Sequence, residues 1–297
     1  MKIRRSERKQ AKIKLALQGS SGSGKTYSSL LLGKGLTSGD FTKIAIIDTE
    51  NKSADLYAHL GSYNVVSMEA PYSPERYIEA IELCEKAGMD VIILDSISHC
   101  WDYLLEVHCN MPGNSFANWA KVTPRQNSFI NKILSSEAHI IATMRVKQDY
   151  VLSQKNGKMV PEKVGLKAIQ RNDLDYEFTI LFDIDITHQA KATKDRTGLF
   201  VNMSEFKIGP NTGKMINEWC NQNHRERKEE ILEEIAQCTT IEALRYVYSK
   251  YPTKQGEIKP MILEKKRELE NIISQVISKE EVIEQTKNQK YGIDKSQ

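Results

Sequence analysis

The sequence lacks any apolar run that approaches the ~20 residues needed to cross a membrane. Its first fourteen residues carry seven Lys and Arg side chains against a single Glu. No hydrophobic segment of the kind found in secretion signals follows them. We therefore expect a cytoplasmic protein that has no membrane partner.

Cysteine is also scarce. The 297 residues include five cysteines, and no two of them form a C-x-x-C motif, so we expect reduced thiols. Two His-Cys dipeptides, His99-Cys100 and His108-Cys109, invite a test for zinc. On one helix they would be about 12 to 15 Å apart along the axis, which is too far for a shared metal ion.

Charge of one sign is not in large excess either. The net charge of +3 does not make the chain a strong polycation, and cations instead cluster at the N-terminus and between Arg145 and Arg171. The length exceeds one typical domain, and the composition turns to Glu, Lys, Ile and Leu after Trp219. We expect a basic arm over residues 1–10, a main domain over 11–222, a helical domain over 223–278 and a disordered tail over 279–297.

Glycine is concentrated in one short segment. Residues 19–26 read Gly-Ser-Ser-Gly-Ser-Gly-Lys-Thr, which completes the phosphate-binding pattern G-x-x-x-x-G-K-[ST]. The glycines let the backbone aim N–H groups at phosphate oxygens, Lys25 reaches the β- and γ-phosphates, and the Thr26 hydroxyl can ligate Mg²⁺. The expected binding set is Gly19, Ser20, Ser21, Gly22, Ser23, Gly24, Lys25 and Thr26. The pattern predicts a nucleoside triphosphate with Mg²⁺, and a flexible Gly/Ser turn is the alternative. We expect ATP, although the sequence does not distinguish it from GTP.

Strand-like and helix-like segments alternate around this loop. Residues 11–18 alternate apolar and polar side chains, and continuous apolar runs end near residues 48, 94 and 144. Helical patterns cover 26–36 and 73–86. This order predicts an α/β fold with a mostly parallel sheet and helices on both faces. Closely spaced strands over 174–208 predict a β-hairpin extension of the sheet.

Two acidic positions could serve the hydrolysis of a nucleotide. Such an enzyme needs one acid on the Mg²⁺ side and often a second carboxylate to orient or deprotonate water. Asp95 follows one Ile-rich strand, and the pair Asp48 and Glu50 follows another. Periodicity alone does not rank them, and either could instead cap a following helix.

The residues around these acids resemble a known family. The run from Ile46 to Glu50, Tyr57, Leu60-Gly61 and the run from Val91 to Ser96 are similar to the core of RecA-type ATPases. The resemblance implies a RecA-like P-loop NTPase core. It also implies that Asp95 is the Mg²⁺-side acid, that Glu50 is the general base, and that Lys25 acts on the phosphates.

Residues 192–198, Ala-Thr-Lys-Asp-Arg-Thr-Gly, resemble the K-x-R element that RecA-like oligomers insert into a neighbour's nucleotide site. Lys194 and Arg196 are two positions apart, so on a strand they point to the same side and could both meet γ-phosphate charge. The resemblance implies a homo-oligomer, either ring or filament, with catalysis completed in trans. An exposed basic hairpin is the alternative.

The predicted strand over 139–144 leads into the second basic segment. Thr143 could sense the γ-phosphate, or it could simply cap the strand. The segment from Arg145 to Arg171 has the composition of a mobile loop, and the RecA resemblance implies that this loop contacts single-stranded DNA. A solvated surface is the alternative. The implied contacts are Arg145, Lys147, Tyr150, Lys155, Lys158 and Lys163.

Further motifs are similar to a narrower group. Residues 119–125, 141–145, 163–166 and 170–178 resemble phage and prophage AAA-family nucleotide-binding proteins, which include RecA-related single-strand annealing recombinases. The resemblance implies an ATPase in a bacterial host that binds single-stranded DNA and promotes annealing or recombination. A single-strand DNA-binding protein is a further candidate partner. Two alternatives remain: a nucleotide-dependent switch or loader that acts on a replication protein, and a P-loop small-molecule kinase.

Overall fold

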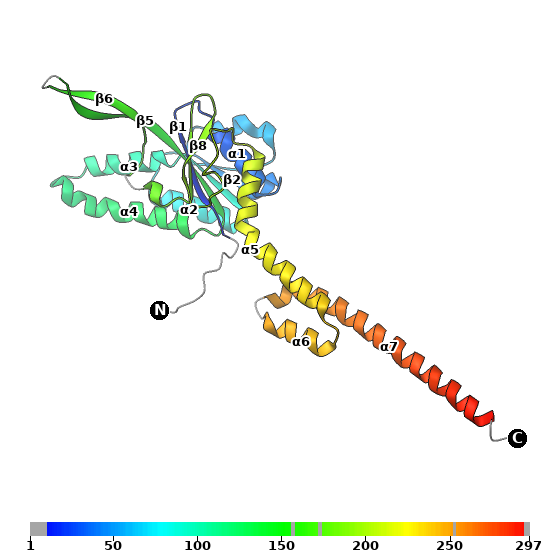
Figure 1. Cartoon of the computed structure of the whole chain (residues 1–297). Helices are drawn as coiled ribbons and strands as arrows, with labels where there is room; N and C mark the ends of the chain where they lie inside the picture. Colours follow the sequence, from blue (N-terminus) through cyan, green and yellow to red (C-terminus); the bar gives the residue numbers. More distant parts are fainter. Residues whose placement is uncertain (1–10, 156–157, 172–173, 252–253, 294–297) are drawn as a thin grey trace. The chain divides into compact units, whose positions relative to one another are not determined.

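The computed structural model describes residues 11–155, 158–171, 174–251 and 254–293. The described residues divide into two compact units, one within residues 11–221 and the other within residues 222–293. The predicted phosphate-binding loop and both candidate acids belong to the first unit (Figure 1).

An eight-stranded sheet forms the centre of the first unit, in the order β3-β2-β4-β5-β1-β7-β8, with β6 paired to β5. Neighbouring strands run parallel except β6 and β8, which run antiparallel to β5 and β7. Because parallel strands end at a common edge, the residues that follow β1, β2 and β4 meet there. The strands are β1 (Lys14–Gly19), β2 (Ile44–Asp48), β3 (Asn64–Ser67), β4 (Val91–Asp95), β5 (His139–Lys155), β6 (Lys158–Ala168), β7 (Ile180–Ile184) and β8 (Ala190–Asp195).

Helices cover both faces of this sheet (Figure 1). Leu15 and Leu17 of β1 join the core on one face, while Ala16 joins the core on the other, because successive strand residues point to opposite sides. Both faces are therefore buried, and the predicted α/β fold with a mostly parallel sheet is confirmed. The first face carries α1 (Lys25–Leu36) and the beginning of α5 (Pro210–Gln237), and the second carries α2 (Pro74–Lys86), α3 (Ser98–Cys109) and α4 (Ser115–Ser135). Short 3-10 helices are η1 (Phe41–Lys43), η2 (Ser53–Leu60) and η3 (Leu174–Tyr176).

The basic segment after Arg145 forms a two-stranded ribbon in place of the expected mobile loop. β5 continues beyond the sheet, and β6 pairs with it from Val146 opposite Ala168 to Lys155 opposite Lys158 (Figure 1). An Asn-Gly dipeptide separates the two strands in the sequence, and this dipeptide is a strong hairpin signal. The composition of this segment indicated its positive charge but not its strand pairing, so the expectation of a mobile loop was wrong.

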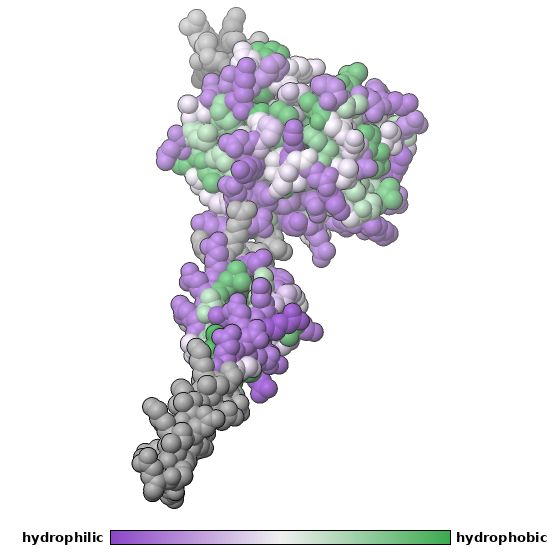
Figure 2. All heavy atoms as spheres, turned by 90° about the vertical axis from the view of Figure 1, so that its right-hand side faces the viewer, coloured by the Kyte–Doolittle hydropathy of each residue, from purple (hydrophilic) through white to green (hydrophobic). Residues whose placement is uncertain are grey.

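The second unit is helical and contains the later part of α5, α6 (Ile241–Lys250) and α7 (Gln255–Ile293). Its core includes Ile231, Leu244 and Ile258, and Figure 2 shows mostly hydrophilic side chains on the coloured surface around them. α7 runs into the segment for which we expected a disordered tail. Glu, Lys and Gln keep that segment hydrophilic but are also good helix formers. None of the described helices is long and apolar enough to span a membrane.

Candidate functional site

The chain turns sharply between β1 and α1. Gly22 and Gly24 have φ angles of 79° and 88°, a left-handed conformation that glycine adopts without strain. A Cβ on Gly19 would lie 2.5 Å from the carbonyl oxygen of Ile184, so only glycine fits that close approach. Gly24 directly precedes α1, whose first N–H groups have no intrahelical partner and suit an anion.

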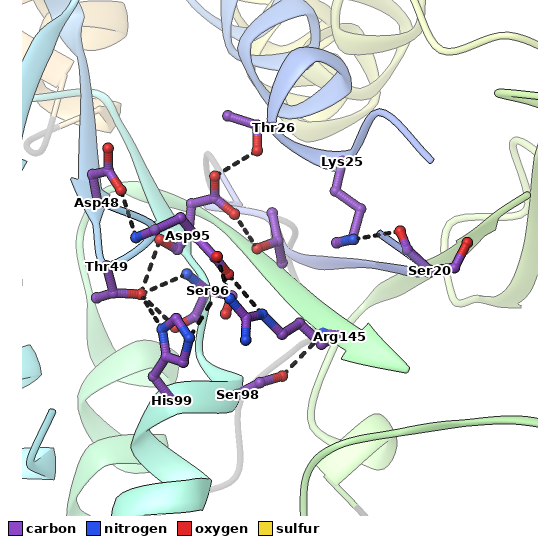
Figure 3. A network of polar contacts seen from close by, with 12 residues as sticks. Ser20, Lys25, Thr26, Asp48, Thr49, Asp95, Ser96, Ser98, His99 and Arg145 are labelled. Carbon is purple, nitrogen blue, oxygen red and sulfur yellow. Dashed lines mark hydrogen bonds and ion pairs between the residues drawn. The ribbon is translucent and has the colours of Figure 1, made fainter. Parts of the chain in front are cut away.

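Lys25 folds back onto this loop. Its Nζ donates hydrogen bonds to the carbonyl oxygens of Gly19 and Ser20, each at 2.9 Å (Figure 3). Burial lowers the pKa of Lys25, and the nearby carboxylates of Asp95 and Glu50 oppose that shift. The loop therefore holds a partly desolvated cation, whose charge is screened less than it would be in water.

Asp95 ends β4 and is 2% exposed. Its Oδ2 accepts a hydrogen bond from Thr26 Oγ1 at 2.6 Å, and its Oδ1 accepts one from Thr143 Oγ1 at 2.5 Å. Burial raises the pKa of Asp95, and these two hydroxyl donors oppose the shift. The structure thus brings together Thr26 and Asp95, the two residues assigned to Mg²⁺ from the sequence. Thr143, assigned to the γ-phosphate, is fully buried behind Asp95 and does not line the cavity described below.

Asp48 ends β2, directly beside Asp95 in the sheet register. Its two carboxylate oxygens accept hydrogen bonds from the backbone N–H groups of Glu50 at 2.7 Å and Ala54 at 2.9 Å. Because Asp48 is occupied by the backbone, it positions the turn that carries Glu50.

Glu50 forms a two-point ion pair with Arg145. Arg145 Nε donates to Oε1 at 2.9 Å, and Nη2 donates to Oε2. Burial favours a higher pKa for Glu50, but the hydrogen bonds and charge of Arg145 outweigh it and hold the pKa below its ordinary value. Glu50 is therefore ionised at neutral pH, with both oxygens bound to one guanidinium.

A second polar contact joins the ends of β2 and β4. Thr49 Oγ1 lies 2.8 Å from His99 Nδ1 and accepts a hydrogen bond from the Ser96 N–H at 2.9 Å (Figure 3). His99 Nε2 in turn lies 4.0 Å from Glu50 Oε1. Burial, with the charge of Arg145, lowers the pKa of His99, so the imidazole is neutral at pH 7.

A cavity of about 960 Å³ adjoins the phosphate-binding loop. Seven of the residues predicted to bind or hydrolyse the nucleotide line it, namely Ser21, Gly22, Gly24, Lys25, Thr26, Glu50 and Asp95. Arg145, which we expected on a DNA-binding loop, also lines it. Residues of the loop and both catalytic carboxylates therefore share one open space.

The sequence analysis did not assign several other lining residues to this site, among them Tyr27, Tyr57, His188 and Lys207. The rings of Tyr27 and Tyr57 are 5.8 Å apart and form an aromatic part of the wall. His188 Nδ1 donates to the Ser23 carbonyl oxygen at 3.0 Å, across 165 positions of sequence. No local pattern could have indicated that contact.

Lys194 and Arg196 lie outside this cavity. Lys194 Nζ donates to the carbonyl oxygen of Asp175 at 2.6 Å, and Arg196 Nη2 donates to that of Tyr176 at 2.7 Å. β8, which carries Lys194, ends the strand order. The two cations are thus separate from the cavity of their own chain, and their action on a second copy stays a prediction.

The residues assigned to DNA divide into two groups. Arg145 pairs with Glu50, and Lys147 is exposed at the base of the ribbon. The backbone of Tyr150, Lys155, Lys158 and Lys163 belongs to the ribbon. The side chains of these four lie outside the described part of the structure.

The oxygens of Thr26 and Asp95 fit Mg²⁺, which prefers hydroxyl, carboxylate, phosphate and water ligands. Within the described ranges, no group of three or more His, Cys, Asp and Glu side chains could hold a metal ion. A cation at Thr26 and Asp95 would therefore share its ligands with a phosphate or water. Ser23 Oγ, buried in the loop without a hydrogen-bond partner, is one more group that a ligand could satisfy.

The chain was compared with known proteins. A family model for the AAA domain matches residues 11–210, which include every residue named above as lining the cavity. Among solved structures, a KaiC-like protein from the hyperthermophilic archaeon Pyrococcus horikoshii OT3 is similar, with a TM-score of 0.41 and 16% sequence identity. That match covers 67% of this chain and 87% of the other. No curated protein matches the sequence.

Proposed function

The chain belongs to the AAA domain family of P-loop NTPases, and from this premise we propose that it hydrolyses ATP, binds single-stranded DNA as an oligomer and promotes annealing or recombination. The observation that carries the hydrolase part is the hydrogen bond between Thr26 and Asp95, beside Lys25 and in the same cavity as Glu50. These groups come from three separate segments that meet at the carboxyl edge of the sheet.

The loop supplies the phosphate contacts. Its backbone amides and the start of α1 bind phosphate oxygens, and Lys25 exchanges its carbonyl partners for the β- and γ-phosphates. Tyr27 and Tyr57 offer ring faces for the base. Thr26 and Asp95 would hold Mg²⁺, and the bound ion would neutralise phosphate charge.

Glu50 is the general base. Its lowered pKa keeps it ionised at neutral pH, but Arg145 occupies both carboxylate oxygens. Each oxygen keeps a second lone pair, but the contacts with Arg145 make Glu50 a weaker base, so loss of one of them would prepare Glu50 to accept a proton from water. Arg145 lines the same cavity and would then be free to face the phosphates. We therefore expect Arg145 to move from Glu50 to the phosphates before hydrolysis.

DNA binding and assembly rest on separate features. The β5–β6 ribbon carries the basic segment, and its charge suits a phosphate backbone. The role in annealing is supported by the sequence resemblance to phage and prophage proteins. Lys194 and Arg196 would complete the site of a neighbouring subunit.

The direct test is the ATP hydrolysis rate with and without a single-stranded oligonucleotide, at several salt concentrations. We expect stimulation by the oligonucleotide that falls steeply as salt rises, because phosphate contacts release counterions. Turnover that ignores DNA would contradict the DNA part of the proposal. Absence of turnover under every condition would contradict the hydrolase part.

A mixing experiment tests action in trans. Arg196→Ala retains an intact loop, and Lys25→Ala retains an intact Arg196, so each variant alone should be inactive and the mixture should regain activity. Lys191→Ala, which changes an exposed lysine on the same strand, should stay active alone. A mixture that regains nothing would exclude a trans-acting Arg196.

A further inference from the structure

Two adjoining cavities lie on the sheet face that carries α4, apart from the nucleotide cavity. The larger has a volume of about 540 Å³ and the smaller about 380 Å³. Arg171 and Leu174 line both, so the two spaces share a wall. Neither contains a residue of the phosphate-binding loop.

The larger cavity is basic. Lys167, Arg171 and Lys194 line it, against the single carboxylate of Asp175 and a Gln18-bonded Asp183 nearby. Lys167 and Arg171 are exposed, so a ligand can reach them from solvent. Arg171 Nη1 donates to Asn127 Oδ1 at 3.1 Å, which orients the guanidinium at the boundary between the cavities.

Each cavity also has a buried polar atom without a hydrogen-bond partner. Gln170 is 8% exposed and lines the larger cavity, and its Nε2 donor is unpaired. Gln126 is 2% exposed and lines the smaller cavity, and its Oε1 acceptor is unpaired. Buried polar groups normally have partners, so these two point to something that binds there.

The chemistry of the two spaces is complementary. The larger offers cations and an amide donor, which suit a phosphate. The smaller is lined by Gln126, Asn127 and Asn131, whose amides can both donate to and accept from the edge of a base. Tyr176, 64% exposed at the larger cavity, adds a ring on which a neighbouring base can stack.

We propose that the two cavities together bind one nucleotide unit of single-stranded DNA, with its backbone phosphate at Lys167, Arg171 and Gln170 and its base edge at Gln126. The choice of DNA as the ligand rests on the proposed function. Lys167 lies in β6 and Arg171 follows it, so the site continues the basic ribbon onto the body of the domain.

The test is the binding of a fluorescent oligothymidylate, followed by anisotropy at several salt concentrations. The double variant Lys167→Ala/Arg171→Ala should bind about tenfold more weakly. Its plot of log affinity against log salt should be shallower by about 0.7, because the variant loses its contact with one phosphate of a single strand. Lys86→Ala, an exposed lysine on α2 that lines neither cavity, should change neither value.

A second variant separates binding from folding. Gln170→Leu removes an unpaired buried amide, so its thermal unfolding midpoint should be equal to or above that of the wild type while oligonucleotide affinity falls. A purely structural glutamine would instead lower the midpoint and leave affinity unchanged, and that result would overturn the proposal.

Competition identifies the source of the phosphate. Thymidine monophosphate and inorganic phosphate should displace the oligonucleotide only weakly. If either competes as well as unlabelled oligonucleotide, the site takes small phosphates and the proposal is wrong. Unchanged oligonucleotide binding in all variants would also overturn it, while ATP hydrolysis and ribbon contacts would stand. A wild-type protein that binds no oligonucleotide would overturn both this site and the DNA part of the proposed function.

Discussion

Asp95 and Glu50 follow neighbouring strands at one edge of the sheet. Their surroundings nevertheless shift the pKa values of the two carboxylates in opposite directions. Burial raises the pKa of Asp95, and the hydroxyl groups of Thr26 and Thr143, which donate hydrogen bonds to its carboxylate, oppose that shift. Glu50 faces the guanidinium of Arg145, so its pKa is lowered. Environments that push the pKa values of two carboxylates apart are typical of acids with different tasks.

The two sides of the cavity also differ in how closely they already have the arrangement that hydrolysis needs. Thr26 and Asp95 already contact each other and need only a metal ion and a phosphate. Glu50 is bound to a cation that lowers its pKa and so makes it a weaker base. We therefore expect Thr26 and Asp95 to determine nucleotide and metal binding, and Glu50 with Arg145 to determine the rate of the chemical step.

The largest expected effect concerns the chemical step, where replacement of Glu50 and replacement of Asp95 should have different consequences. Glu50→Gln should lower ATP turnover by about 10²- to 10⁴-fold and leave ATP affinity nearly unchanged, because an amide cannot accept the proton. Asp95→Asn should lower turnover and also weaken Mg²⁺-dependent binding. Steady-state hydrolysis, together with titration of a fluorescent ATP analogue with and without Mg²⁺, measures both. Equal losses of affinity in the two variants would remove the distinction.

The second prediction concerns stability in the absence of nucleotide. The folded pKa of Asp95 is raised, so its stabilising contribution is present at low pH and is lost as pH rises through that pKa. The folded pKa of Glu50 is lowered, so its contribution is present above the ordinary pKa and is lost as pH falls through the folded one. At neutral pH, Asp95→Asn should raise the unfolding midpoint and Glu50→Gln should lower it.

Thermal unfolding of both variants between about pH 4 and pH 8 checks these signs. Midpoint changes of the same sign in both variants at neutral pH would show that the two carboxylates do not differ as described.

A smaller effect is expected when the cation on the Glu50 side is removed. Arg145→Ala takes away the hydrogen bonds and charge that lower the pKa of Glu50, so the acidic limb of the pH–rate profile should move to higher pH. Arg145→Lys retains the charge without the two-point geometry and should move the limb less. Initial rates across the acidic range measure this shift. An acidic limb at the same pH in all three proteins would mean that Arg145 does not control Glu50.

The smallest expected effect tests the hydrogen bond that Thr143 donates to Asp95. Thr143→Val removes one hydrogen bond to a buried carboxylate and should lower kcat about tenfold. KM for ATP should stay the same, because Thr143 is buried behind Asp95. Thr143→Ser should retain activity. A rise in KM with Thr143→Val would instead support direct contact with the γ-phosphate.

The sequence was sufficient for the features that depend on neighbouring residues. The loop from Gly19 to Thr26, the apolar strands before Asp48 and Asp95, and the layered sheet all follow from local pattern. The pairing of strand ends then places Thr26 near Asp95. These elements could be predicted because each is encoded within a short segment.

The remainder depends on contacts between distant segments. Arg145 was assigned to DNA by its place in a basic run, but it meets Glu50 across 95 positions of sequence. His188 reaches Ser23 from the turn between β7 and β8. Thr143 was expected at the end of a strand, but β5 continues to Lys155, and only the packing shows that its hydroxyl faces Asp95. Composition likewise suggested a loop where cross-strand pairing makes a ribbon.

The central claim is that a triphosphate is bound by the loop before α1 and hydrolysed there. The most direct measurement is the ATP hydrolysis rate of Lys25→Ala, beside the exposed-lysine control Lys86→Ala, at matched unfolding midpoints. Loss of at least about 100-fold in Lys25→Ala with full activity in the control is the expected result. Equal turnover in the wild type and Lys25→Ala would contradict the claim.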